Sequence, residues 1–138
     1  MTRDPARLTA ELRGLSEPEF RSFVEKVLKG MGLETKGFRT SGDSMEMEAH
    51  ASSSGEKYLV FATRALDSAR PHDIQKSVER MRKAGVPKGI YMTAGAVSKD
   101  AENYAAQFDV SVADAERFGQ LLEKFGLDKE LDRRSTES

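Results

Sequence analysis

Polar and apolar residues alternate strictly from Met45 to Ala51, and this alternation restricts the fold more than any other feature of the chain. One side of the segment carries only methionine and alanine, whereas the other carries Glu46, Glu48 and His50. A period of two residues is typical of a β-strand with one buried face. The apolar run at residues 57–63 (KYLVFAT) follows a serine-rich turn and predicts a second strand. We therefore expect a β-hairpin over residues 45–63.

The segment before the hairpin has the periodicity of a helix. Ser16 and Glu19 have the spacing of a capping box, in which each side chain satisfies a backbone N–H group of the first turn. Gly32 is expected to end the helix in the left-handed conformation that glycine adopts without strain. The apolar positions between these limits recur every three or four residues and predict one buried stripe, which consists of Phe20, Phe23, Val24, Val27, Leu28 and Met31.

Strands and helices alternate along the rest of the chain. A short helix is expected from Pro5 to about Gly14, followed after the capped helix by a strand at 33–38 and a turn at 40–43. After the hairpin, the pattern predicts a helix at 71–84, a strand at 89–93, a helix capped by Ser98, a strand at 110–112 and a helix capped by Asp114. A meander followed by β-α-β crossovers implies an α/β fold, in which helices cover both faces of a mixed sheet.

Length and composition fit one globular domain. The chain has 138 residues, enough for a core without covalent cross-links. We place the domain at residues 15–126, between a short N-terminal helix at 1–14 and a polar, frayed tail at 127–138. The absence of cysteine excludes disulfides and thiolate metal sites. No apolar run approaches the roughly 20 residues of a membrane span, and the N-terminus lacks a signal-peptide pattern. We expect a cytoplasmic protein with no membrane contact.

Charge is distributed unevenly along the chain. The formal net charge is -1, whereas a protein that coats nucleic acid is usually basic overall. Residues 64–88 nevertheless contain seven basic and three acidic side chains. Solvated helix faces explain such a run most simply. If DNA is bound, the candidate residues are Arg64, Arg70, Lys76, Arg80 and Lys83. Three of these, Lys76, Arg80 and Lys83, are three or four residues apart and should share one side of the predicted helix.

The common catalytic motifs do not occur in the sequence. There is no phosphate-binding P-loop, no G-x-G-x-x-G, no H-E-x-x-H and no G-x-S-x-G. His50 and His72 are the two histidines, too few for a histidine-rich metal site.

The order of several short segments does resemble a known family. The run 15–20 (LSEPEF) leads into a helix that ends at 31–34 (MGLE), and Ser41-Gly42-Asp43 precedes the alternating strand. The apolar strand 57–63 and the segment 89–95 (GIYMTAG) follow in turn. This order resembles the Mrr-type restriction-endonuclease domain, a branch of the PD-(D/E)XK nuclease superfamily, over residues 15–126. The resemblance implies a restriction-endonuclease-like mixed central sheet flanked by helices.

The resemblance also implies an active site, of which this chain retains at best one acidic ligand. In the family a helix Glu, a strand Asp and a Gln-x-Lys converge, so that carboxylates hold a divalent cation and the lysine supports the attacked phosphate. Here Arg21 takes the place of the helix Glu, and Phe61 and Thr63 take the places of Gln and Lys. The strand Asp corresponds to Glu48, or with a different loop length to Glu46 or Met47. Strand alternation points Arg64, the nearest basic side chain, away from the face of Thr63.

A rebuilt metal site is the remaining alternative for the acidic residues. Asp43, Glu46 and Glu48 are the candidate ligands, and Mg²⁺ is the cation that the family implies. We instead expect the two glutamates to form the solvated face of an edge hairpin and expect no cofactor.

These considerations lead to a main hypothesis and an alternative. The main hypothesis is a catalytically inactive restriction-endonuclease-like domain that acts as a DNA-binding or protein-assembly module. It includes a homo-oligomer in which the free hairpin edge pairs with a second copy. The alternative is a weakly active metal-dependent DNA endonuclease.

Overall fold

The computed structural model of the chain describes residues 5–41, 44–64 and 68–131. Along the described residues, the elements are α1 (Pro5–Arg13), α2 (Glu17–Gly30), β1 (Leu33–Ser41), β2 (Ser44–Ala51), β3 (Lys57–Thr63), β4 (Ser68–Ala69), α3 (Pro71–Ala84), β5 (Lys88–Thr93), β6 (Ala96–Val97), α4 (Lys99–Ala106), β7 (Val110–Ala113) and α5 (Ala115–Lys124). No described helix is long and apolar enough to cross a membrane.

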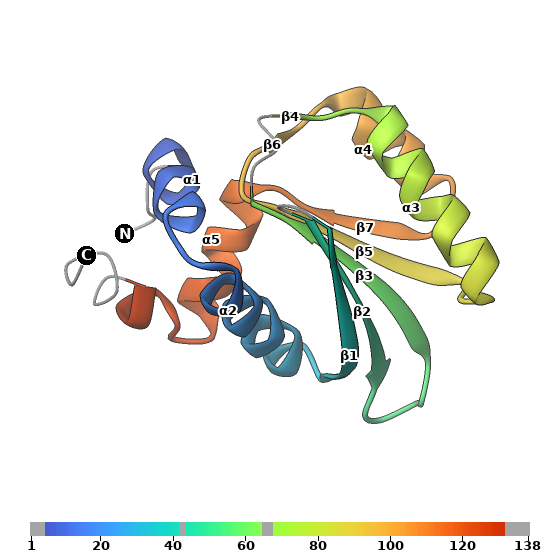
Figure 1. Cartoon of the computed structure of the whole chain (residues 1–138), viewed down its shortest axis with the longest axis horizontal. Helices are drawn as coiled ribbons and strands as arrows, with labels where there is room; N and C mark the ends of the chain where they lie inside the picture. Colours follow the sequence, from blue (N-terminus) through green and yellow to red (C-terminus); the bar gives the residue numbers. More distant parts are fainter. Residues whose placement is uncertain (1–4, 42–43, 65–67, 132–138) are drawn as a thin grey trace.

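The main sheet is mixed, as the sequence predicted. Its strand order is β1-β2-β3-β5-β7, with antiparallel pairing from β1 to β3 and parallel pairing from β3 to β7 (Figure 1). The parallel strands are connected through α3 and α4, because parallel neighbours need a crossover. A second, small sheet pairs β4 with β6. The sequence did not predict it, since two residues are too few to show a period.

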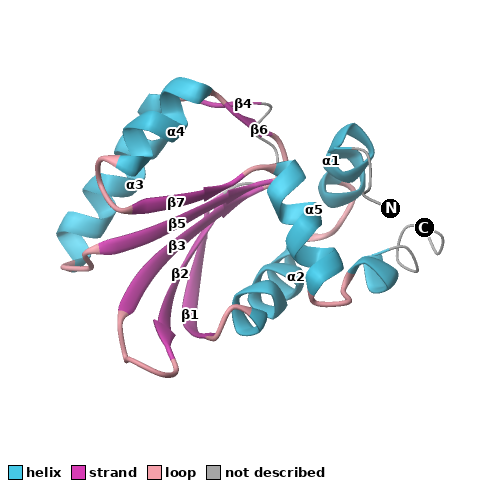
Figure 2. Ribbon diagram, turned by 180° about the vertical axis from the view of Figure 1, so that it is seen from behind, coloured by secondary structure: helices cyan, strands magenta, loops and turns pink. Residues whose placement is uncertain are grey.

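Helices cover both faces of the main sheet (Figure 2). The buried residues of the helices and the sheet form two separate apolar clusters. On one face, α1, α2 and α5 pack against a cluster that includes Phe20, Val24 and Phe118. On the other face, α3 and α4 pack against a cluster that includes Ile74, Met81 and Ala105.

The helix that follows Ser16 begins as expected, but its buried stripe is one residue shorter than expected. Ser16 Oγ accepts from the Glu19 backbone N–H at 3.3 Å, and Glu19 Oε1 accepts from the Ser16 backbone N–H at 2.9 Å, which completes the capping box. Gly32 has a φ of 86°, the left-handed conformation predicted for it. The placement of Met31 in the buried stripe was wrong. Met31 is the C-cap residue and is 45% exposed, because the helix ends before its side chain can turn toward the sheet.

The hairpin formed by β2 and β3 is present, but it is not at the edge of the sheet. β1 continues to Ser41, beyond the strand predicted at 33–38, and pairs with the whole of β2. Thr40 and Ser41 therefore belong to a strand and not to the predicted turn, of which residues 42–43 lie outside the described residues. The edge position goes to β1, so the expectation of a solvated edge hairpin was wrong.

Both ends of the described chain contribute to the core. Leu8 and Leu12 of α1 are almost fully buried, and α1 packs on α5. Residues 128–131 form a short helical turn after α5, in which Leu131 is fully buried. The apolar core thus extends past residue 126, where the sequence suggested a polar tail. Residues 132–138 lie outside the described residues.

Candidate nucleic-acid interface

A cleft of about 550 Å³ lies between α3 and the sheet. Its floor is the face of β1, β2, β3 and β5 that α3 only partly covers. The charged and aromatic residues of its lining are Arg39, Glu46, Phe61, Asp73, Lys76, Glu79, Arg80, Lys83 and Tyr91.

The registers of four strands align one row of side chains across this floor. Arg39 of β1 pairs with Glu46 of β2, which pairs with Phe61 of β3, which pairs with Tyr91 of β5. Paired residues in a sheet have side chains on the same face, so the row presents a cation, a carboxylate and two rings side by side. Thr63 is two residues farther along β3 on the same face and is only 6% exposed.

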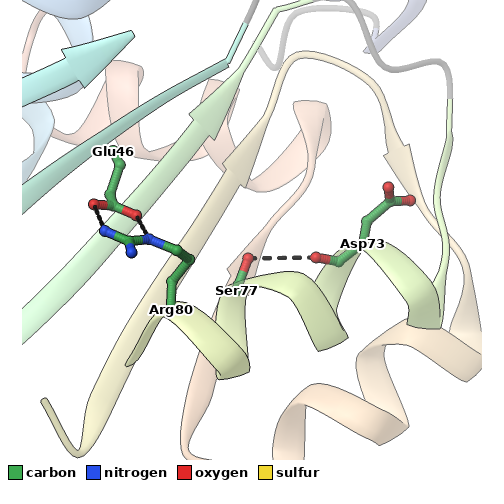
Figure 3. A network of polar contacts seen from close by, with 4 residues as sticks. All are labelled: Glu46, Asp73, Ser77 and Arg80. Atoms are coloured by element: carbon green, nitrogen blue, oxygen red, sulfur yellow. Dashed lines mark hydrogen bonds and ion pairs between the residues drawn. The ribbon is translucent and has the colours of Figure 1, made fainter. Parts of the chain in front are cut away.

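Arg80 of α3 reaches across the cleft and holds the carboxylate of this row (Figure 3). Arg80 Nε donates to Glu46 Oε1 at 2.8 Å, and Arg80 Nη2 donates to Glu46 Oε2 at 2.9 Å. The hydrogen bond from Arg80, together with the charges of Arg80 and Arg39, lowers the pKa of Glu46, although partial burial opposes this shift. Both carboxylate oxygens are engaged by one guanidinium, which is the strong bidentate geometry for this pair. The expectation that Glu46 is solvated was therefore wrong.

The first turns of α3 define the other wall of the cleft. The Arg70 backbone N–H donates to Asp73 Oδ2 at 2.9 Å and so caps the helix, which has Pro71 at its start. Ser77 Oγ donates to the Asp73 carbonyl at 3.4 Å (Figure 3). Burial, with a smaller contribution from the charge of Asp73, raises the pKa of Tyr91 to about 12. The phenol of Tyr91 is consequently neutral at physiological pH.

The family positions named from the sequence do not all meet in this cleft. Phe61 and Thr63 line it, but Arg21 is on α2, across the sheet. The Arg21 guanidinium lies 3.8 Å from the centre of the Phe38 ring and near the carboxylates of two glutamates of its own helix, Glu17 and Glu25.

The two strand glutamates occupy different surroundings. Glu48 pairs with Leu59, is exposed and does not line the cleft. Glu46 pairs with Phe61 and shares the cleft with it. Of the alternatives that the sequence left open for the strand acid, Glu46 is therefore the one opposite the position of the family Gln.

The basic residues named as DNA-binding candidates divide into three kinds. Lys76, Arg80 and Lys83 line the cleft together, as their helical spacing predicted. Arg70 is exposed at the start of α3. Arg64 points away, as strand alternation predicted, and donates to the Leu15 carbonyl between α1 and α2. Arg64 thus connects β3 to the opposite layer and is not a residue of the cleft.

Sequence reasoning did not identify Arg39 and Tyr91 as site residues. The ladder between β1 and β2 is irregular between Lys36 and Arg39, which disrupts the alternation from which the side of Arg39 could be read. Tyr91 lies in a strand whose residues are nearly all buried, so no pattern distinguished it from the core. In both cases the missing information was the register between neighbouring strands, which places these side chains in the row with Glu46 and Phe61.

The residues of the cleft do not fit a divalent cation. Mg²⁺ needs several oxygen ligands in an octahedral arrangement. Within residues 5–41, 44–64 and 68–131, no three acidic or histidine side chains are grouped closely enough to hold a metal ion. Glu46 is engaged by Arg80, and Phe61 and Thr63 supply no carboxylate. Asp43, the third candidate ligand, lies outside the described residues.

A protein-family model matches most of the chain. Residues 12–122 match the family model of the Mrr catalytic domain, described as a restriction endonuclease. No curated protein matches the chain significantly.

Several solved structures have a similar fold, among them two restriction endonucleases and a protein of unknown function. The restriction endonuclease MspJI in complex with a 27-mer oligonucleotide has a TM-score of 0.57 at 20% identity and covers 92% of this chain and 33% of its own. A protein of unknown function, AF1548, has a TM-score of 0.58 at 19% identity, covering 75% of this chain and 63% of its own. The DNA modification-dependent restriction endonuclease AspBHI has a TM-score of 0.54 at 13% identity, covering 97% and 40%. The chain thus spans less than two thirds of the length of each.

Proposed function

The chain belongs to the Mrr-type restriction endonuclease family, and from this premise we propose that it binds DNA in the α3 cleft without cleaving it. The observation that carries this proposal is the bidentate pair between Glu46 and Arg80. The Arg80 guanidinium engages the carboxylate of Glu46, which is paired with Phe61. In the family, a strand carboxylate would instead hold a metal ion. We accordingly propose that no divalent cation is a cofactor here.

Local charge supports DNA as the ligand. Lys76 and Lys83 are exposed, line the cleft and form no ion pair within the described residues. Arg39 lines the same cleft from β1. Phosphates are bound mainly by such lysine and arginine side chains, and the contribution of these contacts to the binding free energy depends little on base sequence. The complex of MspJI with an oligonucleotide supports the same ligand class for this fold.

Assembly with protein is less well supported than DNA binding. The homo-oligomer predicted from the sequence requires an open strand edge, and β1 is such an edge. The irregularity between Lys36 and Arg39 interrupts its ladder, a feature that opposes edge-to-edge pairing. Self-association through the sheet and the cytoplasmic location both stay predictions and have no part in the proposal.

A pair of exposed lysines offers a direct test. Fluorescence anisotropy with a labelled duplex should give an affinity that falls steeply with salt, because bound cations release counterions from DNA. Lys76→Ala with Lys83→Ala should weaken binding and reduce the magnitude of the log–log salt slope by about two, roughly one for each phosphate contact. Arg80 stays intact in this variant, because its removal would release Glu46.

The matched control removes the same charge from the other side of the sheet. Lys29 and Lys129 are both exposed on that side, and Lys29→Ala with Lys129→Ala should leave affinity and slope unchanged. An absence of duplex or single-strand binding at about 50 mM salt, where phosphate contacts are strong, would rule out DNA as the ligand. An equal loss in both variants would show that the cleft is not the site.

A further inference from the structure

The floor of the α3 cleft contains aromatic side chains, which phosphate binding does not require. Phe61 and Tyr91 are paired in neighbouring parallel strands, so their side chains are on the same face of the sheet. Phe61 is only half-buried, although its helical cover on this face includes three apolar residues of α3. A half-buried aromatic ring that lines a cleft together with lysine side chains offers a flat apolar surface in a cationic site.

The dimensions of the cleft favour one small planar group over a length of duplex. A volume of about 550 Å³ is within the range of about 300–1,000 Å³ that pockets for small ligands have. A duplex turns only base edges toward a protein, since the base faces are stacked inside it. A base can reach a ring on the floor of the cleft only after it has left the stack.

We propose that the cleft accepts one unpaired nucleotide of DNA, with its base against Phe61 and its phosphates on Lys76, Lys83 and Arg39. This inference rests on the proposed function and specifies its substrate: single-stranded or locally unpaired DNA, in preference to a continuous duplex. Stacking of a base on an aromatic side chain contributes binding free energy for any base, because every base has a π-face. Arg80, held by Glu46, lines the same cleft as the half-buried ring of Phe61.

The experiment compares three labelled oligonucleotides of one sequence by anisotropy: the single strand, the full duplex, and the duplex with one unpaired base. The single strand and the duplex with the unpaired base should bind roughly tenfold or more tightly than the full duplex, the scale of one base–aromatic stack. Phe61→Leu keeps an apolar side chain but removes the ring, and it should abolish this preference.

Phe38→Leu is the matched control, because Phe38 is an exposed ring outside the cleft and contacts Arg21. This variant should keep the preference. A second readout uses a deoxynucleoside monophosphate: its addition should shift the backbone NMR signals of residues 61–63, 76–83 and 91 in the native protein and not in Phe61→Leu.

The outcomes separate this inference from the proposal on which it rests. Equal affinity for all three oligonucleotides, or a preference that survives Phe61→Leu, overturns the unpaired-nucleotide inference and leaves DNA binding in place. A failure to bind any of the three overturns both.

Discussion

At the scale of single residues, the cleft is characterised by a carboxylate that is bound by an arginine of the protein instead of a metal ion. Glu46 is a strand carboxylate that is paired with Phe61, the residue at the position of the family Gln. A carboxylate on an apolar, partly buried floor needs a positive partner. Arg80 supplies it from α3 with two hydrogen bonds, and the side chain of Glu46 is left only 19% exposed. The pair thus neutralises the charge that would attract a metal ion.

Removal of this carboxylate should have a pH-dependent effect on stability. Glu46→Gln should lower the free energy of unfolding at neutral pH by roughly 1 kcal/mol, the scale of a well-aligned, partly exposed pair. The pKa of Glu46 lies below its ordinary value of 4.5 in the folded state, so its stabilisation is complete above that value and is lost as pH falls through the folded pKa. The difference between wild type and Glu46→Gln in urea denaturation should therefore shrink below about pH 4.5.

Glu48→Gln is the control for that measurement, since it removes the same charge from an exposed position on the same strand. It should change stability by a few tenths of a kcal/mol at most. A difference for Glu46→Gln that stays constant down to pH 3, or that Glu48→Gln reproduces, would contradict the assigned role of the pair.

At the scale of elements, local patterns predicted what local interactions determine. The bounds of α3 and β3 match the residues expected from their periodicity, and the capping box at Ser16 sets the start of α2. The full length of β1 could not be predicted, because its polar residues and irregular ladder show no period. The contact between Arg80 and Glu46 joins residues that are 34 positions apart and depends on which face of the sheet α3 covers. No local pattern contains that information.

The capping box offers a quantitative test at this scale. Ser16→Ala removes the hydroxyl that accepts from the Glu19 N–H and leaves a helix end without a partner. Its cost should be about 1 kcal/mol in the free energy of unfolding, measured by urea denaturation. Ser111→Ala, an exposed serine in β7, is the control and should change stability by less than half as much. A smaller loss at Ser16 than at Ser111 would show that the box does not stabilise α2.

At the scale of the whole molecule, the two faces of the sheet differ in how completely helices cover them. The face covered by α1, α2 and α5 holds the larger apolar cluster, to which Leu131 near the end of the described chain also contributes. The face covered by α3 and α4 is packed less completely and leaves the charged cleft open. Arg21, at the position of the family helix Glu, lies with the first face and is separated from Phe61 and Thr63 by the sheet. The family fold is retained, and the positions that the resemblance assigns to the active site are divided between the two faces of the sheet.

Binding and cleavage measured in one sample test this account most directly. Supercoiled plasmid would be incubated with Mg²⁺ or Mn²⁺ at a protein concentration that gel shift shows to be sufficient for saturation. We expect all of the DNA to be bound and none to be nicked, because Arg80 engages the carboxylate that a metal ion would need. Nicking that depends on the added cation, disappears in Glu46→Gln and persists in Glu48→Gln would contradict this expectation. That result would identify the protein as a metal-dependent endonuclease.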